Sequence, residues 1–192
     1  PMAKAMAWLE SENAKRGMDE RLLPAVLLLK AVARALKRYP EFNGFHRDDG
    51  FQPSSAVHVG VAISLRQGGL IAPAILDADA KSLTQLMHYL TDLVQRTRAG
   101  SLKSSEMSEP TITVTNLGDQ GVDTVFGVIY PPQVALVGFG RIARRPMEDD
   151  GQLTLQPSVV ASLAADHRVS DGHRGALFLL ELRELLQHPE EL

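Results

Sequence analysis

One stretch near the carboxyl end restricts the possible folds more than any other. A polar turn, Asp166 to Gly172, separates a strand-like stretch, Leu153 to Ala165, from a strongly apolar helix over roughly 172–187. Gly172 permits tight backbone geometry where a side chain would clash. Because regular elements hold the backbone on both sides, we expect His167 in this turn to face a cleft from a rigid support.

Three more helices are expected nearer the amino end. Apolar residues recur at helical spacing in the ranges 3–16, 23–38 and 83–98. Ser82 and Gln85 form a candidate capping box before the third helix. One face of the second helix carries four cations, which we expect to be exposed to solvent: Lys30, Arg34, Lys37 and Arg38.

Strand patterns fill most of the remaining chain. They cover the ranges 55–65, 70–76, 111–115, 133–142 and 153–165, and loops are expected at 43–53, 99–110 and 144–151. The range 133–142 is apolar on both faces, as in a central strand, whereas Pro73 favours an edge or a bulge. This order of elements predicts an α/β (α+β) fold, in which a mixed sheet has helices packed mainly on one side.

Composition excludes several classes of function. The 192 residues suffice for one domain with a substantial core. The absence of cysteine rules out a disulfide framework, a cysteine nucleophile and a zinc–cysteine site. A net charge of -3 gives no reason to expect a nucleic-acid partner. No apolar run is long enough to span a bilayer, and the amino end does not resemble a signal peptide, so we expect no membrane partner.

The carboxyl-terminal turn carries the motif His-x-x-x-Asp-Gly at 167–172. This motif resembles the active site of the acyltransferase component of 2-oxo acid dehydrogenase complexes, and chloramphenicol acetyltransferase shares its shorter form. Three other stretches are similar to segments of the same family, in the expected order: Gly69 to Pro73, Thr113 to Gly118 and Pro131 to Gly138. Because these motifs cover nearly the whole chain, it is identified as a member of this acyltransferase family.

The resemblance implies a fold like that of chloramphenicol acetyltransferase and a homotrimer, or a larger core, with active sites at subunit interfaces. Residues 1–192 correspond to the acyltransferase catalytic domain, and we expect an upstream segment of about forty residues to precede them. They include no lipoyl and no subunit-binding domain. The expected partners are decarboxylase and dihydrolipoamide dehydrogenase components, in the cytoplasm or, in a eukaryote, the mitochondrial matrix.

The implied substrates are coenzyme A and an acyl-dihydrolipoamide whose lipoyl group belongs to a separate domain or protein. A free thiol has a pKa of about 8.5, so acyl transfer between thiols near pH 7 needs a base, and histidine suits this task. We assign His167 as the general base that deprotonates coenzyme A, whose thiolate then attacks the thioester. By resemblance, the hydroxyl of Thr115, where many members have serine, stabilises the oxyanion across the subunit boundary.

Four other residues receive supporting roles. Asp171 is expected to orient the turn by pairing with an arginine such as Arg168. By resemblance, Asn116 and Gly118 shape the thioester pocket, and we group Arg168 with them as substrate- or cofactor-binding. We expect no metal, because the alternative ligand set of His167, Asp171 and His173 lacks a second cluster of ligating residues.

Two other functions remain open from the sequence. One is a structural core subunit that assembles the complex without transferring acyl groups. The other is a stand-alone coenzyme A-dependent acetyltransferase acting on a small hydroxyl compound. The sequence also leaves open whether the acyl group is acetyl, branched-chain or succinyl, and how large the assembly is.

Overall fold

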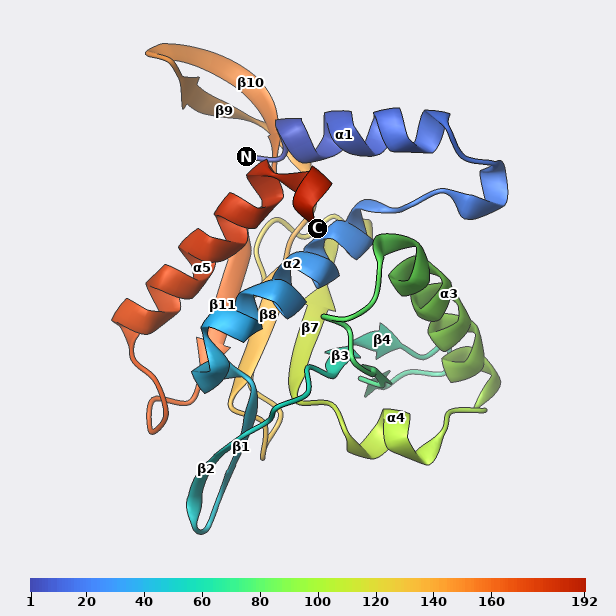
Figure 1. Cartoon of the computed structure of the whole chain (residues 1–192), viewed down its shortest axis with the longest axis vertical. Helices are drawn as coiled ribbons and strands as arrows, with labels where there is room; N and C mark the ends of the chain where they lie inside the picture. Colours follow the sequence, from blue (N-terminus) through green and yellow to red (C-terminus); the bar gives the residue numbers. More distant parts are fainter.

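A computed structural model describes residues 1–192. Its centre is a mixed five-stranded sheet in the order β11-β8-β7-β3-β6. Strands β3, β7 and β8 are parallel, whereas β6 and β11 are antiparallel to their neighbours. The bounds are β3 Val59–Val61, β6 Ala74–Ile75, β7 Ile112–Asn116, β8 Ala135–Phe139 and β11 Ala161–Ala165. Helices α2 and α5 cover one face of this sheet (Figure 1). The expected fold, a mixed sheet with helices on one side, is confirmed.

The expected helices are all present. Their bounds are α1 Ala3–Ala14, α2 Pro24–Arg38, α3 Leu83–Ala99 and α5 Gly172–Gln187. The capping box of α3 is also confirmed, because Ser82 and Gln85 each accept a hydrogen bond from the other's backbone N–H. The range 99–110, expected to be a loop, instead contains the short helix α4, Ser104–Ser108. Short 3-10 turns occupy Met18–Glu20, Pro40–Phe42, Gly118–Gln120 and Pro189–Glu191.

The strand predictions need five corrections. The supposed loop at 43–53 is a hairpin of β1 and β2, and the supposed turn at 144–151 belongs to a second hairpin of β9 and β10. The single strand expected at 153–165 divides between β10 and β11, and the pattern at 55–65 divides between β3 and β4. The strand expected at 70–76 likewise divides between β5 and β6, which belong to different sheets. Period-two alternation indicates an extended backbone but not the strand with which it pairs. The alternation can therefore continue across a point where the chain leaves one sheet and joins another. The bounds are β1 Gly44–Arg47, β2 Gly50–Pro53, β4 Ile63–Ser64, β5 Leu70–Ile71, β9 Ala143–Asp149 and β10 Gln152–Ser158.

Two predictions about strand environment are confirmed. All five residues of β8 are buried, as expected for a central strand. Pro73 separates β5 from β6, and β6 forms an edge of the main sheet. Proline has no N–H to donate to a strand ladder, which explains why pairing stops at this position.

The exposed stripe expected on α2 is wrong for one residue. Lys30 is only 5% exposed. Its Nζ donates hydrogen bonds to the carbonyl oxygens of Asp79, at 2.7 Å, and of Lys81. A buried ammonium needs such acceptors to offset its lost hydration. Lys30 therefore ties α2 to the chain that leads into α3.

Helix α5 is fixed against the core by an aromatic cluster. Phe178 is fully buried, and its ring centroid lies 5.2 Å from that of Phe42 and 6.0 Å from that of Tyr39. Such tilted and edge-on contacts are favourable arrangements of aromatic rings. Since α5 begins at Gly172, this packing also fixes the turn that precedes it. None of the helices is long and apolar enough to cross a membrane.

Candidate active site

The turn that carries His167 is organised around the residue before it. Asp166 is 9% exposed, and its backbone N–H donates to the carbonyl oxygen of Val134 at 2.8 Å. Its own carbonyl oxygen accepts from the N–H groups of Val169 and Ser170, at 3.0 and 3.1 Å. His167 lies exposed within this turn, and its imidazole makes no hydrogen bond within the chain. The turn thus presents a free imidazole on a backbone bonded to the central sheet.

Arg168 pairs with Asp166. Its Nη2 lies 2.6 Å from Oδ2 of Asp166, while its Nε and backbone N–H each donate to Oδ1 at 3.0 Å. The side-chain hydrogen bonds from Arg168 lower the pKa of Asp166 to about 2. The expected pairing of Arg168 with Asp171 is therefore wrong. The buried carboxylate of Asp166 is a better partner for Arg168 than that of Asp171, because it can accept hydrogen bonds from the backbone N–H and the guanidinium of Arg168 together.

Asp171 instead caps helix α5. Its Oδ1 accepts the backbone N–H of Arg174 at 2.9 Å, which satisfies a free donor at the helix start. This bond, followed by the backbone N–H of His173, lowers the pKa of the Asp171 carboxyl. The guanidinium of Arg174 in turn pairs with Glu41 at 2.5 Å and lies 4.9 Å from the ring centroid of Tyr39. These contacts fix the first turn of α5 beside His167.

A cavity of about 360 Å³ lies next to the imidazole. The cavity lies between the end of β11 and the first turns of α5. Its lining is mostly small or apolar: Leu163, Ala165, His167, Ser170, Asp171, Gly172, Gly175, Ala176 and Leu179. Such a lining leaves room for a narrow ligand beside a few polar groups.

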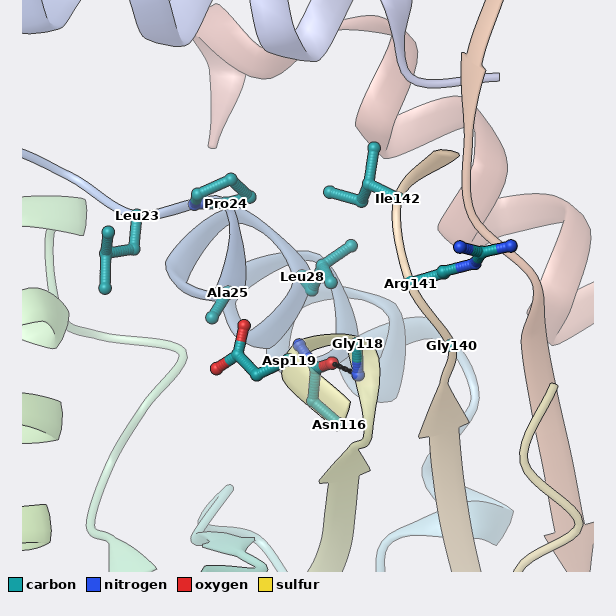
Figure 2. A pocket seen from close by; sticks show the side chains of 10 residues that line it. All are labelled: Leu23, Pro24, Ala25, Leu28, Asn116, Gly118, Asp119, Gly140, Arg141 and Ile142. Carbon is teal, nitrogen blue, oxygen red and sulfur yellow. Dashed lines mark hydrogen bonds between the residues drawn. The ribbon is translucent and has the colours of Figure 1, made fainter. Parts of the chain in front are cut away.

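The second group of expected site residues follows β7. Thr115 is half-buried and pairs with Gly138 of β8. Oδ1 of Asn116 accepts the backbone N–H of Gly118 at 2.9 Å, which closes a turn directly after the strand. Figure 2 shows this turn at the edge of a cavity of about 290 Å³, below the start of α2. The cavity is lined by Leu23, Pro24, Ala25, Leu28, Asn116, Gly118, Asp119, Gly140, Arg141 and Ile142.

The sheet topology separates these two groups within one chain. Strand β7 runs parallel to β8, whereas β11 runs antiparallel to β8. The carboxyl ends of β7 and β11 therefore lie at opposite ends of the sheet, measured along the strands (Figure 1). Thr115 is level with Gly138, whereas Ala165 is level with Ala135. Gly138 and Ala135 are three residues apart on β8, so Thr115 and Ala165 are offset by roughly 10 Å along the strands. His167 lies two residues further along the chain from Ala165. A single chain therefore does not bring the hydroxyl of Thr115 to His167.

The alternative metal site does not form around His167. Metal-ligating atoms from three side chains gather within 4.8 Å of one another at the other end of α5, on His188, Glu190 and Glu191. His167, Asp171 and His173 make no such group. The imidazole of His167 instead lies exposed beside the cavity.

Comparison with known proteins identifies the family of this chain. The family model of the 2-oxoacid dehydrogenases acyltransferase (catalytic domain) matches residues 1–192. The chain belongs to this acyltransferase family. The chain is 35% identical over 185 residues to the dihydrolipoyllysine-residue acetyltransferase component of the pyruvate dehydrogenase complex of Staphylococcus epidermidis. The match covers 93% of this chain and 41% of that relative, so the chain spans less than half of the relative's length.

Solved structures support the same assignment of the acyltransferase. The dihydrolipoamide acetyltransferase of Azotobacter vinelandii and a cubic core of the pyruvate dehydrogenase multienzyme complex each match at 31% identity and a TM-score of 0.88. Each match covers 97% of this chain and 77% of the other. A chloramphenicol acetyltransferase matches at 15% identity and a TM-score of 0.57, over 94% of this chain and 82% of that one, which shows a shared fold. The predicted family and fold are confirmed.

Sequence reasoning missed two contributors to the candidate site. One is Asp166, whose carboxylate and backbone hold the turn, although its place directly before His167 and two residues before Arg168 was a usable signal. The other is the pair of Glu41 and Arg174, which joins residues far apart in the chain. No local pattern predicts a contact at that separation.

Proposed function

We propose that this chain transfers an acyl group between dihydrolipoamide and coenzyme A, as the catalytic domain of a 2-oxo acid dehydrogenase complex. The observation that carries the proposal is the exposed imidazole of His167, held on a bonded turn beside an apolar cavity, in a member of this acyltransferase family. The S. epidermidis relative is named an acetyltransferase, which makes acetyl the first acyl group to test.

The spacing of three residues supports their proposed roles. The structural study of the A. vinelandii enzyme concerns the role of a serine, a histidine and an asparagine in its catalytic mechanism. That serine precedes the histidine by the same interval that separates Thr115 from His167. The asparagine follows at the interval that separates His167 from Asp171. Thr115 retains the serine's hydroxyl, and Asp171 replaces the amide by a carboxylate.

The proposed reaction needs one proton acceptor and one oxyanion donor. His167 accepts the proton of the coenzyme A thiol, and the resulting thiolate attacks the thioester carbon of the acyl-dihydrolipoamide. The hydroxyl of Thr115 donates a hydrogen bond to the tetrahedral oxyanion. The intermediate then expels the dihydrolipoyl sulfur, which receives the proton from the His167 imidazolium. Acyl transfer is direct, because the incoming thiolate is already a strong nucleophile. Asn116 and Gly118 shape the thioester end of the site.

We further propose that each active site forms between two subunits of a homotrimer, or of a larger core. The separation of Thr115 from His167 within one chain supports this, because only a neighbouring copy can supply the missing half. Large apolar side chains are also exposed on the β9–β10 hairpin and on the segment before β8, as expected for surfaces that contact another chain. They are Phe126, Val128, Tyr130, Leu153 and Leu155.

The remaining partners follow from the family. A lipoyl group supplied by a separate domain or protein carries the acyl group to the site, and decarboxylase and dihydrolipoamide dehydrogenase components act before and after it. The reaction of thiols with a thioester needs no metal ion, so the proposal includes none. The cytoplasm, or the mitochondrial matrix in a eukaryote, remains the predicted compartment.

The deciding experiment measures transfer from acetyl-, isobutyryl- and succinyl-coenzyme A to free dihydrolipoamide. We expect His167→Ala to lower turnover at least roughly a hundredfold with an unchanged unfolding temperature, because the imidazole makes no bond within the chain. His188→Ala, which removes an exposed histidine at the far end of α5, should retain full activity.

Each outcome of this experiment has a distinct meaning. Transfer that depends on His167 supports the proposal and ranks the acyl groups. A folded, assembled chain that transfers from none of the three donors favours the structural core subunit. Acetyl transfer to small hydroxyl compounds, but not to dihydrolipoamide, favours a stand-alone acetyltransferase.

A further inference from the structure

We propose that Asp166 and Arg168 are positioning residues, which hold His167 in the orientation that acyl transfer requires. This inference rests on the proposed function of His167 as the general base. It assigns Asp166 a role in orienting His167 that goes beyond holding the turn. It also replaces the expected substrate-binding role of Arg168.

The pair bridges the residue between its members. The carboxylate of Asp166 receives the backbone N–H of Arg168 together with two N–H groups of its guanidinium, at Nε and Nη2. The two peptide groups on either side of His167 are thus tied together by main-chain and side-chain bonds. Paired bonds between a guanidinium and a carboxylate fix geometry more strictly than a single contact. His167 therefore has little freedom to rotate its backbone.

The bridge is itself attached to the centre of the molecule. Asp166 is buried, and its backbone N–H donates to Val134, which is 1% exposed and directly precedes β8. The charge on the carboxylate is retained at every pH at which an imidazole acts as a base, since the Arg168 bonds hold the pKa of Asp166 near 2. A catalytic group performs best when its support is rigid to within a fraction of an ångström. The sheet is the rigid support, and the hydrogen bonds of Asp166 connect the backbone of His167 to it.

The two roles for Arg168 predict different kinetics. A substrate-binding cation needs free donors, whereas Asp166 uses Nε and Nη2 of this guanidinium and leaves Nη1. Loss of a substrate contact raises KM, whereas loss of base orientation lowers kcat with little change in KM. The structure therefore predicts an effect on kcat.

The test compares Asp166→Asn and Arg168→Gln with the wild-type chain. We expect kcat to fall roughly ten- to a hundredfold, while KM for coenzyme A and for dihydrolipoamide changes by less than roughly twofold. Arg168→Lys, which keeps the charge but not the paired geometry, should give an intermediate kcat.

The matched control breaks a similar pair elsewhere. Glu106 is 7% exposed, and its two carboxylate oxygens accept from Nη1 and Nη2 of Arg96, each at 2.6 Å. Glu106→Gln removes this pair at a comparable depth but away from His167, so it should leave kcat unchanged. A kcat loss in the control as large as that in Asp166→Asn would assign both effects to general loosening of the fold.

Two results would overturn the inference. One is wild-type kcat in folded Asp166→Asn or Arg168→Gln. The other is a raised KM for coenzyme A at constant kcat, which would restore Arg168 as a binding residue. If Asp166→Asn does not fold, Arg168→Gln decides alone, because the Arg168 side chain is 66% exposed. Failure of the proposed function is distinguishable, since it would appear as a wild-type chain that is inactive or independent of His167.

Discussion

Thr115 illustrates how little a single side chain reveals about its role. In the sheet it is a half-buried strand residue, and its hydroxyl makes no hydrogen bond within the chain. Two positions earlier, the hydroxyl of Thr113 donates to the side chain of Gln133 at 2.7 Å and is buried. The two threonines share a strand face, but only Thr115 retains a free hydroxyl. A free donor at the expected site is what oxyanion stabilisation requires.

We therefore expect Thr115→Val to lower turnover at least roughly tenfold without changing the free energy of unfolding. Valine keeps the branched shape and removes only the hydroxyl. Thr115→Ser retains the hydroxyl and should keep most of the activity. Steady-state kinetics and thermal unfolding of the three proteins provide the check, and an unchanged turnover in Thr115→Val would mean that another group holds the oxyanion.

At the scale of elements, the site depends on the junction between β11 and α5. Asp166 joins the turn to Val134 just before β8, Asp171 caps the helix, and the aromatic contacts of Phe178 hold the helix to the core. These interactions act at three successive points along the junction. The sequence indicated the strand, the turn and the helix, but not the bonds that make them one rigid unit.

The junction should weaken in acid. The pKa of Asp166 is about 2 in the folded chain, below its ordinary value of 3.8. A lowered folded-state pKa contributes stability that is complete above the unfolded value and is lost as pH falls toward the folded value. We expect urea unfolding to show this loss between about pH 4 and pH 2.

The matched variants isolate this contribution. Asp166→Asn removes the titrating group, so its unfolding free energy should fall less steeply over the same pH range than that of the wild type. Asp48→Asn, on the exposed turn between β1 and β2, removes a carboxylate without this pairing and should follow the wild type. Identical slopes for wild type and Asp166→Asn would argue against the contribution.

At the scale of the whole molecule, the arrangement of strands keeps the two halves of the proposed site apart. Strands β7 and β11 end at opposite ends of the sheet, and each carries one half of the proposed site. A chain of this fold can therefore be correctly folded and still lack a complete site. In the proposed intersubunit site, assembly is part of the chemistry, because it joins the hydroxyl of one subunit to the imidazole of another.

Subunit complementation tests this arrangement. His167→Ala and Thr115→Val chains with different tags are coexpressed, and assemblies that hold both are purified. A site shared between chains regenerates roughly one intact site in three in a mixed trimer, so activity should recover to roughly a third of the wild type. Activity no higher than that of either variant alone would place the site within one chain.

The sequence by itself determined the four long helices, the central strand and the family. Those features depend on local periodicity, capping residues and ordered motifs, all of which are contained in short stretches of chain. Only the tertiary structure decided which strand pairs with which, that Arg168 bonds Asp166 rather than Asp171, and that Lys30 is buried. It also decided that Thr115 and His167 lie at opposite ends of the sheet. These outcomes depend on competition between partners distant in the chain, and local patterns contain no information about which partner wins.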